Sequence, residues 1–148
     1  MQAFYQTYGK TNLGEAMRKF ILMLLLAGVS SNAMAEPVEI GNGFGGDRVF
    51  VYPATVKKAG SSVTMWDLLN ASTPQNLPGY SPFLSKVSQV QYDCDEMKTR
   101  TLYTNIYSEK DGKGAKILYK DTSTLLDWQP VLSGTAQEAL FKFACGKK

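Results

Sequence analysis

The chain contains no histidine among its 148 residues. Histidine supplies the usual proton shuttle of enzymes, the base that activates a catalytic serine and the commonest zinc ligand. A hydrolase built on this chain would need an unusual base. The sequence therefore predicts a protein that is not an enzyme and that has no metal or cofactor.

No apolar run in the chain is long enough to cross a membrane. The longest, residues 20–29, is about half of the ~20 residues that a membrane-spanning helix needs. Arg18 and Lys19 precede this run, and small residues ending in Ala33 and Ala35 follow it. This order of basic, apolar and small residues is typical of a secretory signal, so we expect residues 1–35 to be a signal peptide cleaved after Ala35.

Residues 1–16 lack the character of a signal peptide, whereas Met17 and the basic residues after it form a normal opening. Translation is therefore expected to start at Met17. Because no cysteine lies near the cleavage point, no lipid is expected to be attached there. The sequence predicts an exported product without a stable membrane anchor.

Neither sign of charge is in large excess. The chain has sixteen Lys and Arg residues against thirteen Asp and Glu, a net charge of +3, and removal of residues 1–35 would lower it further. So small a charge does not favour nucleic acid or an anionic membrane as a partner. Lysines near tyrosines also occur on surfaces that bind single-stranded nucleic acid. Here the favoured interpretation is that the lysines are solvated and keep the edge of the sheet from pairing with other chains. These lysines are Lys110, Lys113, Lys116 and Lys120.

Cysteine is scarce as well, with only Cys94 and Cys145. In an exported protein an even pair of cysteines normally bonds, so the sequence predicts one disulfide. The bond would close a loop of about fifty residues, for which chain-entropy arguments give about 4 kcal/mol of stabilisation.

Residues 36–47 hold a glycine-rich stretch that matches the G-x-G-x-x-G dinucleotide pattern. That pattern needs a strand before it and a helix after it, and here a cleavage site precedes it and a predicted strand follows. We therefore expect residues 36–47 to be a flexible leader, followed by one domain over residues 48–148.

From residue 48 onward, β-branched and aromatic residues occur in short runs that are separated by turn residues. The runs predict strands over 48–52, 62–70, 86–94, 99–108 and 115–119, with a proline-rich loop containing Pro74, Pro78 and Pro82 after the second. Consecutive short strands joined by tight turns indicate an antiparallel meander. Asp93, Asp95 and Glu96 are interpreted as a solvated acidic hairpin rather than a calcium site.

The C-terminal end changes to helical spacing. Thr135 and Glu138 form a capping box, apolar residues recur with helical period over 136–144, and Gly146 is placed to end the helix. The fold class predicted is α+β: an antiparallel β-sheet meander packed against one C-terminal helix, which the disulfide joins to a strand.

Five stretches carry a family resemblance: residues 54–70 with Trp66, 91–94 with Cys94, 105–114, 127–131 with Trp128, and 133–147 with Cys145. In this order and with this pair of cysteines, the chain resembles the surface-adhesin protein E family of Gram-negative envelope proteins. The resemblance implies a sheet joined to a C-terminal helix by one disulfide. It also implies adhesion to host matrix or serum proteins such as laminin, vitronectin and plasminogen.

Two classes of function stay open. One is a binding protein that reaches the cell surface; the other is a soluble periplasmic structural or accessory protein whose aromatic residues are all core. Exposed aromatic side chains often anchor protein interfaces, so Tyr103, Tyr107 and Trp128 are candidate binding residues. Trp66 is favoured as a core residue.

Lys147 and Lys148 form a further candidate binding site. A terminal lysine offers an ammonium and a carboxylate, the pair that lysine-binding kringle domains of plasminogen accept. The alternative is that these lysines only complement the dipole of the helix end. The unpaired edges of a small sheet also predict self-association, with a homodimer as the simplest product.

Overall fold

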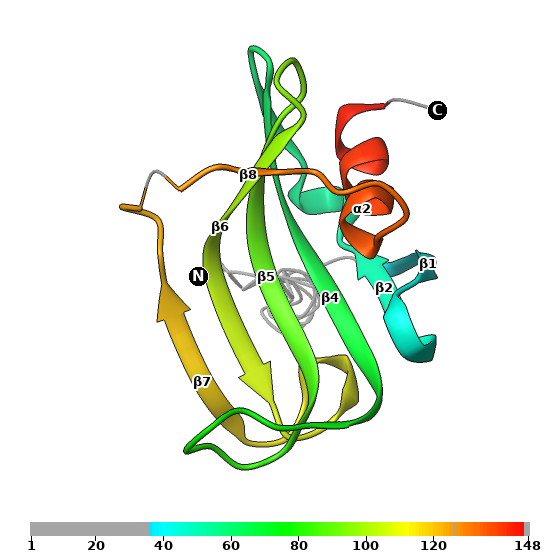
Figure 1. The fold of residues 1–148 in the computed structure, drawn as a ribbon, viewed down its shortest axis with the longest axis vertical. Helices are drawn as coiled ribbons and strands as arrows, with labels where there is room; N and C mark the ends of the chain where they lie inside the picture. The colour runs from blue at the N-terminus through cyan, green and yellow to red at the C-terminus, as the bar shows by residue number, and fades with distance from the viewer. Residues whose placement is uncertain (1–35, 126, 147–148) are drawn as a thin grey trace, which may run out of the picture. The chain divides into compact units, whose positions relative to one another are not determined.

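A computed structural model describes residues 36–125 and 127–146, which form one antiparallel sheet and one helix (Figure 1). The sheet order is β1-β2-β4-β5-β6-β7, with β3 paired to β4 and β8 paired to β6. This arrangement confirms the predicted fold class. The strands are β1 (Val38–Asn42), β2 (Arg48–Val51), β3 (Lys57–Ala59), β4 (Ser62–Gln75), β5 (Phe83–Asp93), β6 (Lys98–Tyr107), β7 (Lys116–Asp121) and β8 (Gln129–Pro130), and the helix is α2 (Ala136–Cys145).

Strand β1 lies inside the segment predicted to be a flexible leader, and that prediction is wrong for residues 38–42. β1 pairs antiparallel with β2. Ile40 packs against the buried core, and the carboxylate of Glu39 accepts a hydrogen bond from Nε of Arg48 at 3.0 Å. The glycine-rich residues form the turn between the two strands, including a 3-10 turn over Phe44–Gly46.

Strand β4 is longer than predicted and runs through Pro74. Its regular pairing with β5 stops at Asn70 opposite Ser85 and resumes only at Gln75 opposite Phe83. Pro74 thus lies in an irregular stretch, where a missing backbone N–H disrupts no ladder hydrogen bond.

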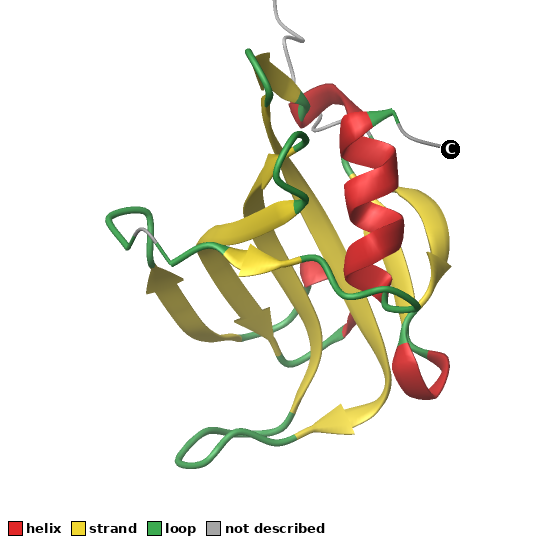
Figure 2. Cartoon of the chain, turned by 45° about the horizontal axis from the view of Figure 1, so that its top comes forward, coloured by secondary structure: helices red, strands yellow, loops and turns green. Residues whose placement is uncertain are grey.

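Helix α2 packs on one face of the sheet, over β1, β4 and β5 (Figure 2). We call this the inner face and the opposite one the outer face. The buried core lies beneath the helix and consists of Val51, Val63, Met65, Tyr92, Phe141 and Ala144. The predicted disulfide joins Cys94, just after β5, to Cys145 in the last turn of α2, with 5.6 Å between their Cα atoms.

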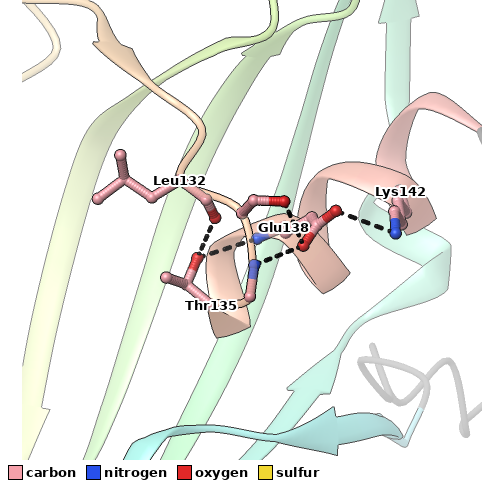
Figure 3. Close-up of polar contacts among 6 residues, drawn as sticks. Leu132, Thr135, Glu138 and Lys142 are labelled. Atoms are coloured by element: carbon pink, nitrogen blue, oxygen red, sulfur yellow. Dashed lines mark hydrogen bonds and ion pairs between the residues drawn. The ribbon is translucent and has the colours of Figure 1, made fainter.

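The start of α2 is capped as predicted (Figure 3). The hydroxyl of Thr135 accepts a hydrogen bond from the backbone N–H of Glu138, and the carboxylate of Glu138 accepts one from the N–H of Gly134 at 2.7 Å. Glu138 also pairs with Lys142 one turn later, at 3.0 Å. The Gly134 bond and then Lys142 lower the pKa of Glu138, so it stays charged at the positive end of the helix dipole. Gly146 ends the helix with a left-handed φ of 66°.

The acidic hairpin between β5 and β6 is held by Asp93. Its Oδ1 accepts hydrogen bonds from the backbone N–H groups of Asp95 at 3.1 Å and Glu96 at 3.0 Å. Glu96 in turn pairs with Lys98 at 2.9 Å. These contacts give the acidic residues a local role in closing the turn.

Candidate binding surface

The outer face of the sheet has no α-helix across it in the described part of the chain, but one end is covered by the β6–β7 connection, which contains a 3-10 turn over Lys110–Gly112. There the carboxylate of Asp111 accepts a hydrogen bond from Nδ2 of Asn70 at 2.7 Å. The N–H of Gly112 donates to the hydroxyl of Ser85 at 3.0 Å. These contacts bury Asn70 and Ser85. The part of the outer face nearer the middle of the strands remains in contact with solvent.

Three aromatic rings cross this outer face, and we call Trp66, Tyr103 and Tyr119 the aromatic row. The ring centroids of Trp66 and Tyr103 lie 6.4 Å apart at an interplanar angle of 19°, and those of Tyr103 and Tyr119 lie 6.5 Å apart at 18°. Trp66 on β4 and Tyr103 on β6 are both paired with Gln89 of β5, so their rings approach each other across that strand. The row therefore extends over four strands.

A β-bulge places Tyr103 in the row. Gln89 pairs with Tyr103 while Val90 pairs with Thr101, so Leu102 is an extra residue in β6. Simple alternation would put Tyr103 on the same face as Thr101, which is the inner face. The bulge shifts the alternation by one residue and puts Tyr103 on the outer face.

A second bulge brings a cation to the row. Ile106 pairs with Leu118 while Tyr107 pairs with Lys116, so Ile117 is extra in β7. Lys116 thereby shares the outer face with Tyr119 instead of the inner face with Leu118. Its Nζ lies 5.8 Å from the ring centroid of Tyr107 and 6.0 Å from that of Tyr119, within cation–π range.

Trp128 lies beside β6 rather than in the core. The guanidinium carbon of Arg100 is 4.8 Å from its ring centroid, and Nε of Arg100 donates to Oε1 of Gln91 at 2.8 Å. These two contacts hold the guanidinium over the indole ring. The outer face thus presents a second aromatic and cationic pair.

Tyr119 is the most open ring of the row, with 55% of its surface exposed. Partial desolvation and the neighbouring Asp121 raise the pKa of its hydroxyl. The phenol therefore remains protonated at neutral pH and can both donate and accept a hydrogen bond to a partner.

The structure brings Tyr103 and Tyr107 to one surface and sets Trp128 at its margin. Lys147 and Lys148 lie outside the described residues, as does the signal peptide predicted for residues 1–35. Trp66 and Tyr119 are members of the row that were not among the predicted binding residues. Side chains alternate between the two faces along β4, so Trp66 lies on the face opposite to that of the buried Met65. This alternation is the sequence signal that could have identified Trp66.

Within the described residues, no group of three or more acidic or cysteine side chains could hold a metal ion. That same part of the chain holds no helix with the length and apolar character needed to span a bilayer.

The comparisons with known proteins agree with the fold. No curated protein sequence matches the chain. The crystal structure of protein E from non-typeable Haemophilus influenzae superposes with a TM-score of 0.50 at 13% sequence identity, covering 77% of this chain and 81% of that one. At this identity the likeness concerns the fold alone. The family model for surface-adhesin protein E matches residues 38–146, which is most of the chain and all of the sheet and helix. The chain therefore belongs to the surface-adhesin protein E family.

Proposed function

We propose that this protein is an exported, non-enzymatic adhesin that binds a host protein through the outer face of its sheet. Membership of an adhesin family supports surface or exported placement and binding of host proteins in general. The observation that carries the choice of surface is the aromatic row, with Lys116 beside it.

The row has the composition of a protein-binding surface. Interfaces are enriched in Trp, Tyr and Arg, and a few such residues account for most of the binding energy. The rings are held in place by their mutual stacking, so little side-chain entropy is lost when a partner binds. Lys116 and Arg100 add positive charge, which favours an acidic patch on the partner.

Laminin, vitronectin and plasminogen are the first partners to test, because the resemblance to the family pointed to matrix and serum proteins. For plasminogen, Lys147 and Lys148 stay a separate candidate contact. Loss of binding after deletion of both Lys147 and Lys148 would assign plasminogen to the tail, and retention would assign it elsewhere. Both lysines are deleted because removal of Lys148 alone would leave Lys147 as the terminal lysine.

Surface placement distinguishes adhesion from the alternative of a periplasmic accessory protein without a host ligand. Labelling of intact cells with a reagent that does not cross the outer membrane should modify the protein if it is an adhesin. Labelling that occurs only after cell lysis would favour the periplasmic alternative.

The binding surface itself is tested with Tyr119→Ser and Lys116→Gln, two changes at exposed positions. Loss of an interface anchor typically costs about 1 to 2 kcal/mol, so each variant should bind immobilised laminin, vitronectin or plasminogen about tenfold more weakly. Leu132→Ser is the matched control, because Leu132 is 60% exposed and lies before α2, away from the row. Unchanged affinity in both row variants, with circular dichroism showing that they are folded, would refute the proposed surface.

A further inference from the structure

The inner face of the sheet contains a cavity of about 180 Å³ that the aromatic row does not touch. The cavity lies between β4, β5, β6 and the first half of α2. Its polar lining consists of Asp67, Lys86, Ser88, Tyr92, Thr99, Thr101 and Gln137, with apolar side chains completing the wall. Thr101 is exposed and Lys86 is half-buried, so the cavity meets solvent on their side.

Asp67 is the unusual member of this lining. It is only 5% exposed, its Oδ2 is fully enclosed, and no described residue donates a hydrogen bond to its carboxyl group. Burial raises the pKa of Asp67 to about 7, although Lys86 acts in the opposite direction. An enclosed carboxyl group without a partner destabilises a fold, so packing alone gives no reason for an acid at this position.

Lys86 carries the charge opposite to that of an ionised Asp67, but it does not contact the Asp67 carboxyl directly. Ser88 is the residue of β5 paired with Asp67, and Lys86 is paired with Leu69, so Lys86 is the diagonal neighbour of Asp67 on the same face. Among the described residues, no ion pair within 4.0 Å joins Lys86 to Asp67. The cavity therefore contains one acidic and one basic group that do not neutralise each other by direct contact.

The size of the cavity limits its occupant. It has the volume of roughly six water molecules at about 30 Å³ each, and it is smaller than the ~300 to 1,000 Å³ typical of pockets for drug-sized ligands. A molecule with the bulk of a small amino acid fills this space, whereas a peptide segment does not.

We propose that this cavity binds a small zwitterion of the α-amino-acid class, with its ammonium group on Asp67 and its carboxylate on Lys86. The ammonium donates to Oδ1 of Asp67, the carboxyl oxygen that is not enclosed, and the hydroxyl of Ser88 is a further acceptor beside it. The carboxylate supplies the counter-charge for Lys86. The ligand carries one positive and one negative charge, and so do Asp67 and Lys86 together. Each charged group in the cavity therefore gains a partner of opposite sign.

Leu140 of α2 and Val90 of β5 belong to the apolar part of the wall, together with Val49, Leu69 and Ala136. They favour a short apolar side chain on the ligand, so L-alanine is the first probe. This site lies on the face opposite the aromatic row and does not depend on the adhesin function.

Titration of the ¹⁵N-labelled protein with L-alanine tests the proposal. The expected result is saturable shifts of the amide signals of Asp67, Ser88 and Thr101. Ethylamine carries only the ammonium and propionate only the carboxylate, so each should bind at least about tenfold more weakly than L-alanine, which corresponds to 1.4 kcal/mol. The absence of a saturable response to L-alanine, or equal binding of the three probes, would overturn the proposal.

Variants locate the binding. Asp67→Asn preserves the shape of the side chain, Lys86→Met removes the ammonium, and Thr101→Phe fills the cavity from an exposed position. Each should lower the affinity for L-alanine at least about tenfold, while Lys57→Met on the exposed strand β3 should leave it unchanged. Unchanged affinity in Thr101→Phe and in Asp67→Asn, with both proteins giving the dispersed spectrum of the folded chain, would overturn the assignment.

Discussion

Asp67 couples the stability of the fold to pH. Its folded-state pKa of about 7 lies above the ordinary value of 3.8, because burial disfavours the charged form. The folded state thus keeps a proton that the unfolded chain releases near pH 4. The contribution of this group is most favourable at low pH and is lost as the pH rises to 7.

The variant Asp67→Asn should therefore match the wild type in stability near pH 4 and exceed it near pH 8, by on the order of 3 kcal/mol. Urea unfolding across this range measures the difference. Asp121→Asn is the control, and its effect on stability should have the opposite sign. Hydrogen bonds from Ser123 lower the pKa of Asp121, so the loss of that carboxylate should slightly destabilise the protein at high pH. A difference between Asp67→Asn and the wild type that does not vary with pH would contradict this account.

Gly114 is a second residue whose chemistry is dictated by its surroundings. Its φ is +77°, and a Cβ there would lie 2.8 Å from Cγ of Glu109 and still closer to the hydroxyl of Ser108. Gly114→Ala should cost roughly 2 to 3 kcal/mol, because a steric clash adds to the left-handed conformation. Gly60→Ala should cost only about 1 kcal/mol, since φ is +61° but nothing lies within 4 Å. Thermal unfolding compares the two, and equal costs would show that the connection adjusts freely.

At the scale of elements, the disulfide fixes the end of α2 to the end of β5. The two cysteines are 51 residues apart, for which the chain-entropy model gives about 4 kcal/mol. The double variant Cys94→Ser/Cys145→Ser should lose roughly 2 to 5 kcal/mol and leave no free thiol. Urea unfolding measures the loss. Hydrogen exchange should accelerate in α2 more than in β4, and uniform acceleration would show that the bond stabilises the whole domain instead.

For the whole molecule, export predicts a mature protein that begins at Glu36. Residues 20–29 and the small residues after them are the predicted export signal, and the first strand begins at Val38, two residues beyond the expected cleavage. N-terminal sequencing of protein from the cell envelope tests this, with a cytoplasmic preparation as the control. Envelope protein that retains Met1 or Met17 would refute cleavage.

Self-association is the other prediction at this scale. β7 lies at one end of the sheet order and β1 at the other, and each has one partner along that order. Unpaired edges promote strand addition, so we expect a dimer in the micromolar range. Light scattering should show it, and Tyr119→Pro in β7 should weaken it because proline cannot donate a ladder hydrogen bond. A monomer at all accessible concentrations would refute this prediction.

The sequence by itself determined the features that depend on local chemistry. Alternating apolar residues predicted the central strands, Thr135 and Glu138 marked the start of the helix, and the pairing of Cys94 with Cys145 followed from there being only two cysteines. These features were confirmed because period, capping and pairing are properties of short segments or of simple counts.

Only the tertiary structure decided which side chains share a face. The sequence identified Tyr103, Tyr107 and Trp128 as aromatic candidates, but the bulges at Leu102 and Ile117 brought Tyr103 and Lys116 to the outer face. A bulge arises from how neighbouring strands pair, and each one reverses the alternation that sequence reasoning relies on. The strand β1 and the enclosed carboxyl of Asp67 were missed for the same reason, because both result from contacts between segments distant in the chain.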